Sequence, residues 1–320
     1  MTLVAAVLVL AGQELPSRAL PAHPGSTDSV GYTSDGKLFL TAGAQDRQIK
    51  VWLTATWKVL YTFPEQAEAV AIRPDGGLVA VGGPTRTTVW NLVTGNPVHA
   101  LETGRTQALG WSSDGKSLTT VSTVKGGLQV RLWDMPDARE RKSFVIALAA
   151  DPRARAVAPG GVTVAVPFPD GSVRLWDAAE GKERLSLAGQ VDRVTAFAFS
   201  ADASILATSG VEKTVRFWDV PRGKELKLLY GEYGSPRVAF SRDGALAAVS
   251  AEAGIEIWDV KALKRLDAVF GGPGTGIWTP SCLEFSPDGR WLAAGGVLIA
   301  KDAPAGKRVS GPVFFWKLKS

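Results

Sequence analysis

The stretch Val-Arg-Leu-Trp-Asp at 130–134 (VRLWD) decides how this chain folds, because it returns along the whole sequence. Clear copies lie at 173–177, 215–219 and 255–259, and looser copies lie at 49–53, 87–91 and 313–317. Each copy alternates its residues with period two, which predicts a β-strand. Each carries one tryptophan at the same place: Trp52, Trp90, Trp133, Trp176, Trp218, Trp258 and Trp316.

An Asp-Gly pair stands upstream of most of these strands, between two further apolar segments. The pairs are at 35–36, 75–76, 114–115, 243–244 and 288–289. Asp and Gly both tolerate positive φ, which suits tight hairpins. The repeated unit is therefore a sheet of four antiparallel strands with a period of about 40 residues, which is typical of propeller blades.

With these motifs in hand, the chain resembles the WD40-repeat β-propeller family over nearly its whole length, from about Glu14 to Ser320. The resemblance implies an all-β fold, a seven-bladed β-propeller with four-stranded antiparallel blades. We therefore divide the chain into residues 1–13, which are either a signal peptide or an unstructured apolar lead, and residues 14–320, a single propeller domain.

The two ends of the chain are expected to share one blade. The last blade ends on its tryptophan strand at 313–320 and lacks an outer strand. The segment SRALPAH at 17–23 resembles the outer strands of other blades, such as KVLYTF at 58–63, and has no blade of its own. It is predicted to close the ring, which would pair an otherwise open sheet edge. Blade four is expected to be the least regular, because its first turn at 151–161 is long.

Composition excludes some classes of function. The chain has 320 residues, of which 45% are hydrophobic, enough for the core of one closed ring. Its lone Cys282 allows no intramolecular disulfide and is interpreted as a buried small residue at the start of a strand. The net charge of +5 is scattered, with no run of five like charges, so no dedicated nucleic-acid site is predicted.

Residues 2–11 (TLVAAVLVLA) form an apolar run that is too short to span a bilayer as a helix, so no membrane span is predicted. The run resembles the hydrophobic region of a secretory signal peptide, with cleavage near Ala11 or Gly12, although no Lys or Arg precedes it. A misplaced start and a strand left over from an upstream blade are the alternatives. The localisation stays open: cytoplasmic or, if residues 2–12 are a signal peptide, extracytoplasmic.

The resemblance also implies a hydrogen-bonded tetrad of His, Ser or Thr, Asp and Trp, whose role in a blade is structural. The sequence has two histidines, and His99 lies in an outer strand, away from the family's position. Blade one alone can hold a full set: His23, Thr41, Asp46 and Trp52. Asp170 stands six residues before Trp176, as Asp46 does before Trp52, but has no histidine. The ring is expected to depend mainly on apolar packing around its tryptophans.

Two histidines leave few ways to build a catalytic site. A zinc site needs three or four ligands, and a Ser-His-Asp triad needs a histidine beside a strained serine. The glycine-rich segment at 271–276 has no following Lys-Ser/Thr and is interpreted as a flexible connection. No catalytic residue, cofactor or metal is predicted. The alternative is a propeller hydrolase or lyase with a metal or small ligand in the central channel. Its acidic candidates, which turn capping also explains, are Asp46, Asp170, Glu212 and Glu252.

Blade seven is predicted to carry the interaction surface. The loops between blades and those before the tryptophan strands emerge on one face, here called the loop face, and in blade seven both are long, at 271–281 and 300–312. The residues predicted to bind a partner are Trp278, Lys301, Asp302, Lys307 and Arg308. An aromatic ring beside basic side chains is a frequent interface composition and suits a segment with acidic character. The competing interpretation is that Trp278 folds back over its blade. Trp111 and Trp291 are interpreted as packing residues, and Trp57, in the turn after the first tryptophan strand, as a residue that covers the outer strand.

Together these observations predict a monomeric propeller that is a non-catalytic scaffold or binding platform and meets another protein or peptide through the loop face. The fold alone does not name the partner.

Overall fold

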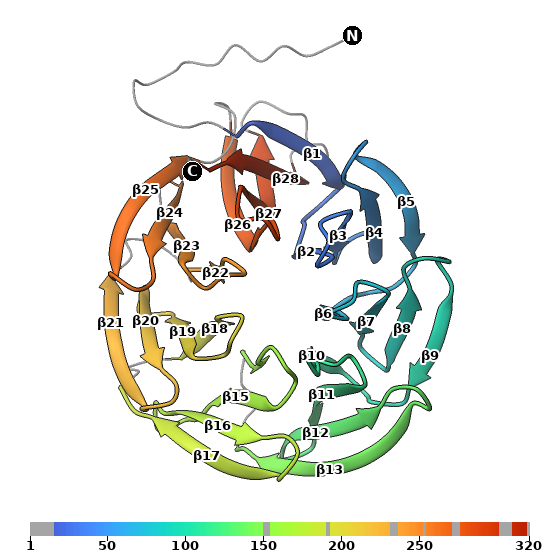
Figure 1. The fold of residues 1–320 in the computed structure, drawn as a ribbon, viewed down its shortest axis with the longest axis vertical. Helices are drawn as coiled ribbons and strands as arrows, with labels where there is room; N and C mark the ends of the chain where they lie inside the picture. The colour runs from blue at the N-terminus through green and yellow to red at the C-terminus, as the bar shows by residue number, and fades with distance from the viewer. Residues whose placement is uncertain are drawn as a thin grey trace.

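Seven sheets are arranged in a closed ring around a central axis (Figure 1). The computed structural model describes residues 16–149, 154–189, 193–230, 236–251, 254–270, 276–300 and 309–318. Every sheet has four antiparallel strands, so the prediction of an all-β, seven-bladed propeller is confirmed. Within the described ranges, no helix has the length and hydropathy to cross a membrane.

Blades one to six each follow the chain from the innermost to the outermost strand. Blade one is β2 (Ser29–Tyr32), β3 (Leu38–Gly43), β4 (Gln48–Leu53) and β5 (Lys58–Phe63). Blade two is β6 (Ala69–Ile72), β7 (Leu78–Gly82), β8 (Thr87–Asn91) and β9 (Pro97–Leu101). Blade three is β10 (Thr106–Trp111), β11 (Ser117–Val124), β12 (Gly127–Asp134) and β13 (Arg139–Ala147).

The second half of the ring repeats this order. Blade four is β14 (Ala156–Val157), β15 (Thr163–Pro167), β16 (Val173–Asp177) and β17 (Lys182–Leu187). Blade five is β18 (Val194–Phe199), β19 (Ile205–Gly210), β20 (Thr214–Asp219) and β21 (Lys224–Tyr230). Blade six is β22 (Val238–Phe240), β23 (Leu246–Ala251), β24 (Gly254–Asp259) and β25 (Lys264–Phe270). Blade four is irregular, as predicted, but its innermost strand of 2 residues lies inside the segment 151–161 that was expected to be a turn. The expectation was wrong because Ala156 and Val157 pair with Ala165 and Val164.

Blade seven joins both ends of the chain. It comprises β26 (Gly276–Phe285), β27 (Trp291–Ala300) and β28 (Val309–Lys317), and β1 (Arg18–His23) is its outer strand. The antiparallel pairing places Arg18 opposite Phe315 and Leu20 opposite Val313. The predicted closure of the ring by an N-terminal strand is therefore confirmed. Residues 1–15, which include the apolar run at 2–11, lie outside the described residues.

Apolar side chains fill the seven interfaces between neighbouring blades, one buried cluster per interface. The cluster between blades seven and one contains Phe39, Trp52, Val313 and Phe315. Each of these four side chains is at most 6% exposed. Burial of this apolar surface stabilises the ring, because a blade cannot cover its own faces.

The Asp-Gly turns fold as tight hairpins, but the two residues have different roles. Gly36 takes the left-handed conformation (φ 69°), whereas Asp35 does not. Asp35 instead accepts hydrogen bonds from the Thr33 hydroxyl (2.8 Å) and the Lys37 backbone N–H (3.0 Å). These hydrogen bonds lower the pKa of the Asp35 carboxyl and hold it ionised. The aspartate is thus an acceptor for its own turn.

Candidate functional site

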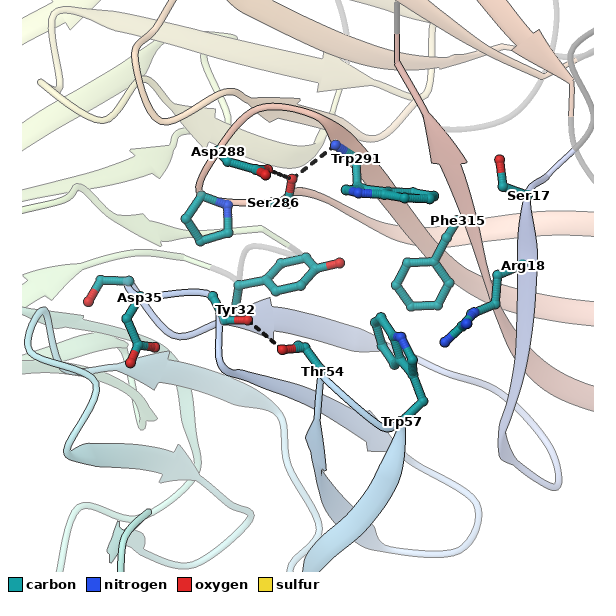
Figure 2. Close-up of a pocket in the computed structure, with 13 residues that line it drawn as sticks. Ser17, Arg18, Tyr32, Asp35, Thr54, Trp57, Ser286, Asp288, Trp291 and Phe315 are labelled. Atoms are coloured by element: carbon teal, nitrogen blue, oxygen red, sulfur yellow. Dashed lines mark hydrogen bonds between the residues drawn. The ribbon is translucent and has the colours of Figure 1, made fainter.

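A pocket opens at the seam where blade seven meets blade one (Figure 2). We call it the seam pocket; its volume is about 630 Å³, within the usual range of ligand sites. Its lining includes Arg18 from the closing strand, Tyr32 and Trp57 from blade one, and Trp291 and Phe315 from blade seven. The pocket therefore exists only because the two ends of the chain meet there.

Aromatic rings form most of one side of the seam pocket. The ring centroids of Trp57 and Phe315 are 4.6 Å apart at an interplanar angle of 63°, a T-shaped pair. Trp57 also packs edge-on against Phe39 at 5.8 Å, and Tyr32 lies 4.6 Å from Phe39. Phe315 is buried at 1% exposure, whereas Tyr32, Trp57 and Trp291 are only partly buried. Partly exposed rings above a buried one can accept an apolar group.

Trp57 stands at a turn position that other blades give to smaller residues. The position, four residues after the end of the third strand, is Gly95, Gly181 and Gly223 in three blades, and Ala138 and Leu263 in two others. It has positive φ throughout, 74°, 71° and 63° at these glycines and 55° at Trp57. A residue with a Cβ in this conformation costs about 1–2 kcal/mol. Sequence reasoning treated Trp57 as a cover of the outer strand and Trp291 as a packing residue and missed the pocket, although this comparison of turns carried the signal.

The charges of the seam pocket are separated along its length. The guanidinium of Arg18 lies 5.2 Å from the centroid of the Trp57 ring, a cation–π contact. At the other end, Asp288 accepts a hydrogen bond from the Ser286 hydroxyl at 2.5 Å, and Asp35 accepts hydrogen bonds within its own turn. These hydrogen bonds lower the pKa of both carboxyls. Burial and the nearby carboxyls of Glu284 and Asp288 raise the pKa of Tyr32, so its hydroxyl stays protonated.

The central channel carries a second cavity, of about 490 Å³, at the same end of the innermost strands. Tyr32, Ser34 and Pro287 line both cavities, so the seam pocket continues into the channel mouth. Glu284 is the carboxyl in the lining of this second cavity, and burial raises its pKa to about 8. A carboxyl that is protonated at neutral pH is a poor cation ligand. Within the described ranges, no group of three or more His, Cys, Asp or Glu side chains could hold a metal ion.

The predicted tetrad of blade one is joined by hydrogen bonds. His23 is 4% exposed; its Nδ1 lies 2.8 Å from Asp46 Oδ2 and its Nε2 lies 2.9 Å from Thr41 Oγ1. The Trp52 indole N–H donates to Thr41 Oγ1 at 3.0 Å. Gly43 makes room for this network, because a Cβ there would lie 2.6 Å from both His23 and Asp46.

Three stretches of the sequence match the family model described as WD domain, G-beta repeat, at residues 15–52, 181–219 and 266–297. Each match begins within three residues of the start of an outer strand and runs into the next blade around the ring. The chain is a WD40-repeat propeller.

Two curated relatives resemble parts of this WD40 propeller. Autophagy-related protein 16 of Arabidopsis thaliana is 27% identical over 199 residues, 59% of this chain and 37% of that protein. Small ribosomal subunit protein RACK1y of Oryza sativa subsp. japonica is 26% identical over 151 residues, 43% of this chain and 43% of that protein. The chain therefore spans less than half the length of either relative.

The other WD40 blades keep only parts of the tetrad. Trp133 and Trp218 each donate to a threonine hydroxyl at 3.0 Å, as Trp52 does. Trp176 does not, and its buried indole N–H has no partner among the described residues. Asp170 is exposed and accepts from Ser172 and Arg174 (2.6 Å each) rather than reaching a tryptophan. These hydrogen bonds lower the pKa of Asp170 to about 2.

Blade seven differs from its prediction. Residues 276–281 and 309–312 were expected in loops, but they belong to β26 and β28. The expectation was wrong because Gly276 to Pro280 pair with Gly296 to Ala300 across the sheet, which extends the first hairpin. Trp278 lies on β26 and packs against Phe314 (5.3 Å between ring centroids) and Trp316 (5.9 Å). Lys301, Asp302, Lys307 and Arg308 lie outside the described residues.

Cys282 was expected at the start of a strand but lies inside β26, opposite Gly295. Its thiol contacts the Thr27 carbonyl at 3.6 Å, and burial raises its pKa to about 12. The thiol therefore stays protonated at neutral pH, which makes it a weak nucleophile.

Proposed function

We propose that this WD40 propeller is a non-catalytic platform that binds another protein. The proposal rests on the closed ring: β1 pairs with β28, so the first strand of the chain completes the sheet of the last blade and covers its outer edge. Loops at both ends of the strands are thereby held on a rigid scaffold, the arrangement that binding loops generally use. The rice relative is named as a protein of the small ribosomal subunit, an assembly, which is compatible with a role in holding proteins together.

The partner is proposed to meet the loop face at blade seven. Residues 301–308 connect β27 to β28 and supply Lys301, Asp302, Lys307 and Arg308, close in the sequence to the end of the long hairpin. Trp278 lies on the neighbouring strand of that hairpin, partly buried against Trp316. Because the connection carries three basic residues and one acidic residue, the preferred partner surface is acidic.

The experiment that tests the platform is affinity capture from the native cell with a C-terminal tag, followed by mass spectrometry. The captured partner is then titrated against the parent chain and against a Lys307→Glu, Arg308→Glu variant. We expect at least about tenfold weaker binding for the variant, since reversed charges repel an acidic partner. The absence of any stoichiometric partner would contradict the platform. Equal affinity of the two proteins would remove only the blade-seven surface.

The alternative is a propeller hydrolase or lyase with a metal or small ligand in the channel. Glu284 lines the channel cavity, and its raised pKa of about 8 makes it an acid rather than a ligand at neutral pH. Elemental analysis of protein purified without chelator discriminates the two proposals, because a channel enzyme of this kind would retain about one metal ion per chain. Light scattering of the same sample checks the proposed monomeric state.

A further inference from the structure

The seam pocket lies at the opposite end of the strands from the loop face. Its turn residues Asp35, Gly36 and Asp288 belong to the hairpins between first and second strands. The loops between blades and the β27–β28 connection leave from the other ends of these strands. A ligand in the seam pocket would therefore occupy a surface separate from the one proposed for blade seven.

The shape of the seam pocket suits an extended ligand rather than a compact one. It begins at Ser17 and Arg18 on the closing strand, passes Trp57, Phe315 and Trp291, and reaches Tyr32. Since Tyr32, Ser34 and Pro287 also line the channel cavity, the seam pocket adjoins that cavity, and the two together are here called the groove. A peptide in an extended conformation fills such a groove with successive side chains.

Three hydrogen-bond donors that have no partner among the described residues line this groove. In the described part of the chain, no hydrogen bond is formed by the indole N–H of Trp57, the indole N–H of Trp291 or the hydroxyl of Tyr32. The raised pKa of Tyr32 keeps its hydroxyl available as a donor. Aromatic walls with free donors favour a ligand that presents apolar groups together with carbonyl oxygens, as a peptide backbone does.

The charge balance of the groove favours an acidic ligand. Arg18 is exposed and, among the described residues, has no carboxylate within ion-pair distance. The carboxyls of Asp35 and Asp288 are instead engaged by the hydroxyls and backbone N–H groups of their own turns. The unpaired charge at the aromatic end is thus positive, and the chain as a whole carries a net charge of +5.

From these observations we propose that the seam pocket is a second docking site, for an extended protein segment in which a large apolar or aromatic side chain stands next to Asp or Glu. The apolar side chain packs among Trp57, Phe315 and Trp291, and the carboxylate pairs with Arg18. Backbone carbonyls accept from the free indole and phenol donors. Trp and Arg at the centre of such a site carry a large share of the binding free energy.

The test selects ligands without naming a partner in advance. Random 12-residue peptides are displayed and selected on the full chain, and the recovered peptides are synthesised and titrated. We expect the selected sequences to share an aromatic or leucine residue beside Asp or Glu. Affinity should fall at least about tenfold for Trp57→Gly and for Arg18→Glu. Trp57→Gly suits the backbone of this turn, which has Gly95, Gly181 and Gly223 in other blades, and circular dichroism checks that the variant keeps its fold.

Matched variants separate docking from general effects. Leu263→Gly makes the same change at the same turn position (φ 50°) of blade six, and Lys182→Glu reverses an exposed charge on blade four. Both should bind the peptides like the parent chain. Peptides without the shared pattern, or binding by both pocket variants within twofold of the parent, would overturn the proposal. A failed capture of a loop-face partner would leave this site standing, since the peptide titrations do not use that face.

Discussion

Replacing His23 by Ala removes the centre of the blade-one tetrad and tests whether the network stabilises the ring. An indole N–H can only donate, so Thr41 Oγ1 accepts from Trp52, and the threonine hydroxyl is free to donate to His23 Nε2. The remaining ring proton, on Nδ1, then donates to Asp46 Oδ2. This arrangement satisfies each group in sequence and leaves Asp46 dependent on His23, because Asp46 Oδ1 is buried without a partner among the described residues.

The structure sets the size of the effect. A hydrogen bond to a charged group contributes about 1.5–3 kcal/mol and a neutral one about 0.5–1.5 kcal/mol. His23 makes one of each, and its loss also leaves a cavity beside a buried carboxylate. We expect His23→Ala to lower the free energy of unfolding by about 2–4 kcal/mol. His99→Ala is the matched control, since His99 is partly exposed on β9 and should cost less than about 1 kcal/mol.

The assay is urea unfolding of the parent, both histidine variants, Asp46→Ala, and the His23→Ala, Asp46→Ala double variant. If the two residues act through one hydrogen-bonded network, the double variant should lose about 1–3 kcal/mol less free energy of unfolding than the two single variants lose together. Strictly additive losses, or equal losses for His23→Ala and His99→Ala, would refute the assignment of a stabilising network.

Three further predictions follow from single features of the ring. Val166→Thr supplies a hydroxyl at the position that Thr120 and Thr208 have in other blades, where it can accept the hydrogen bond of the Trp176 indole N–H. In urea unfolding it should leave the free energy of unfolding unchanged or raise it by about 1 kcal/mol. Val173→Thr, in the same blade, should lower it by about 1–3 kcal/mol. Burial raises the pKa of Glu284 from 4.5 to about 8, so the folded state keeps a proton that the unfolded state loses. The free energy of unfolding should therefore fall as pH rises from about 4.5 to 8, by at most about 1.4 kcal/mol per pH unit. Glu284→Gln should remove this pH dependence, whereas Glu180→Gln, at an exposed position, should leave it unchanged. Leu20→Asp places a charge at a buried position of the closing strand (7% exposed) and should lower the melting temperature strongly. Lys182→Asp, at an exposed position of an outer strand, should leave the melting temperature nearly unchanged. Equal melting temperatures of the two variants by circular dichroism would argue against closure of the ring by this strand.

Local pattern was enough to predict the ring. Each third strand repeats a tryptophan and an alternating apolar pattern, and each blade needs only its two neighbours to bury its faces. SRALPAH was assigned to blade seven by elimination, and β1 does pair with β28 there. The Asp-Gly turns could also be predicted, because the conformation of the glycine and the hydrogen bonds of the aspartate both depend on residues within the same turn.

Pairing between distant residues could not be predicted in the same way. Residues 276–280 have the glycine, threonine and proline of a loop, yet they form a strand because 296–300 lies opposite them. The hydrogen bonds of the tryptophans are equally hidden: the accepting threonine stands 11 residues before Trp52, 13 before Trp133 and 10 before Trp218. These offsets vary with the loop between the second and third strands, so only the sheet register reveals the partner.

In a repeat protein, each residue can be compared with the residues at the same position in the other blades. Trp57 occupies a left-handed turn position that is glycine in three other blades and Ala138 or Leu263 in two more, where no blade but the first has an aromatic residue. Trp291 begins a second strand where blades one and two have Leu38 and Leu78. Packing alone does not require either replacement, since the other interfaces are closed without them. Both lie at the one interface that joins the two ends of the chain, beside Arg18, which has no ion-pair partner among the described residues. A departure from the repeat that costs conformational energy and leaves a pocket open, rather than filling it, is more readily explained by a ligand than by stability.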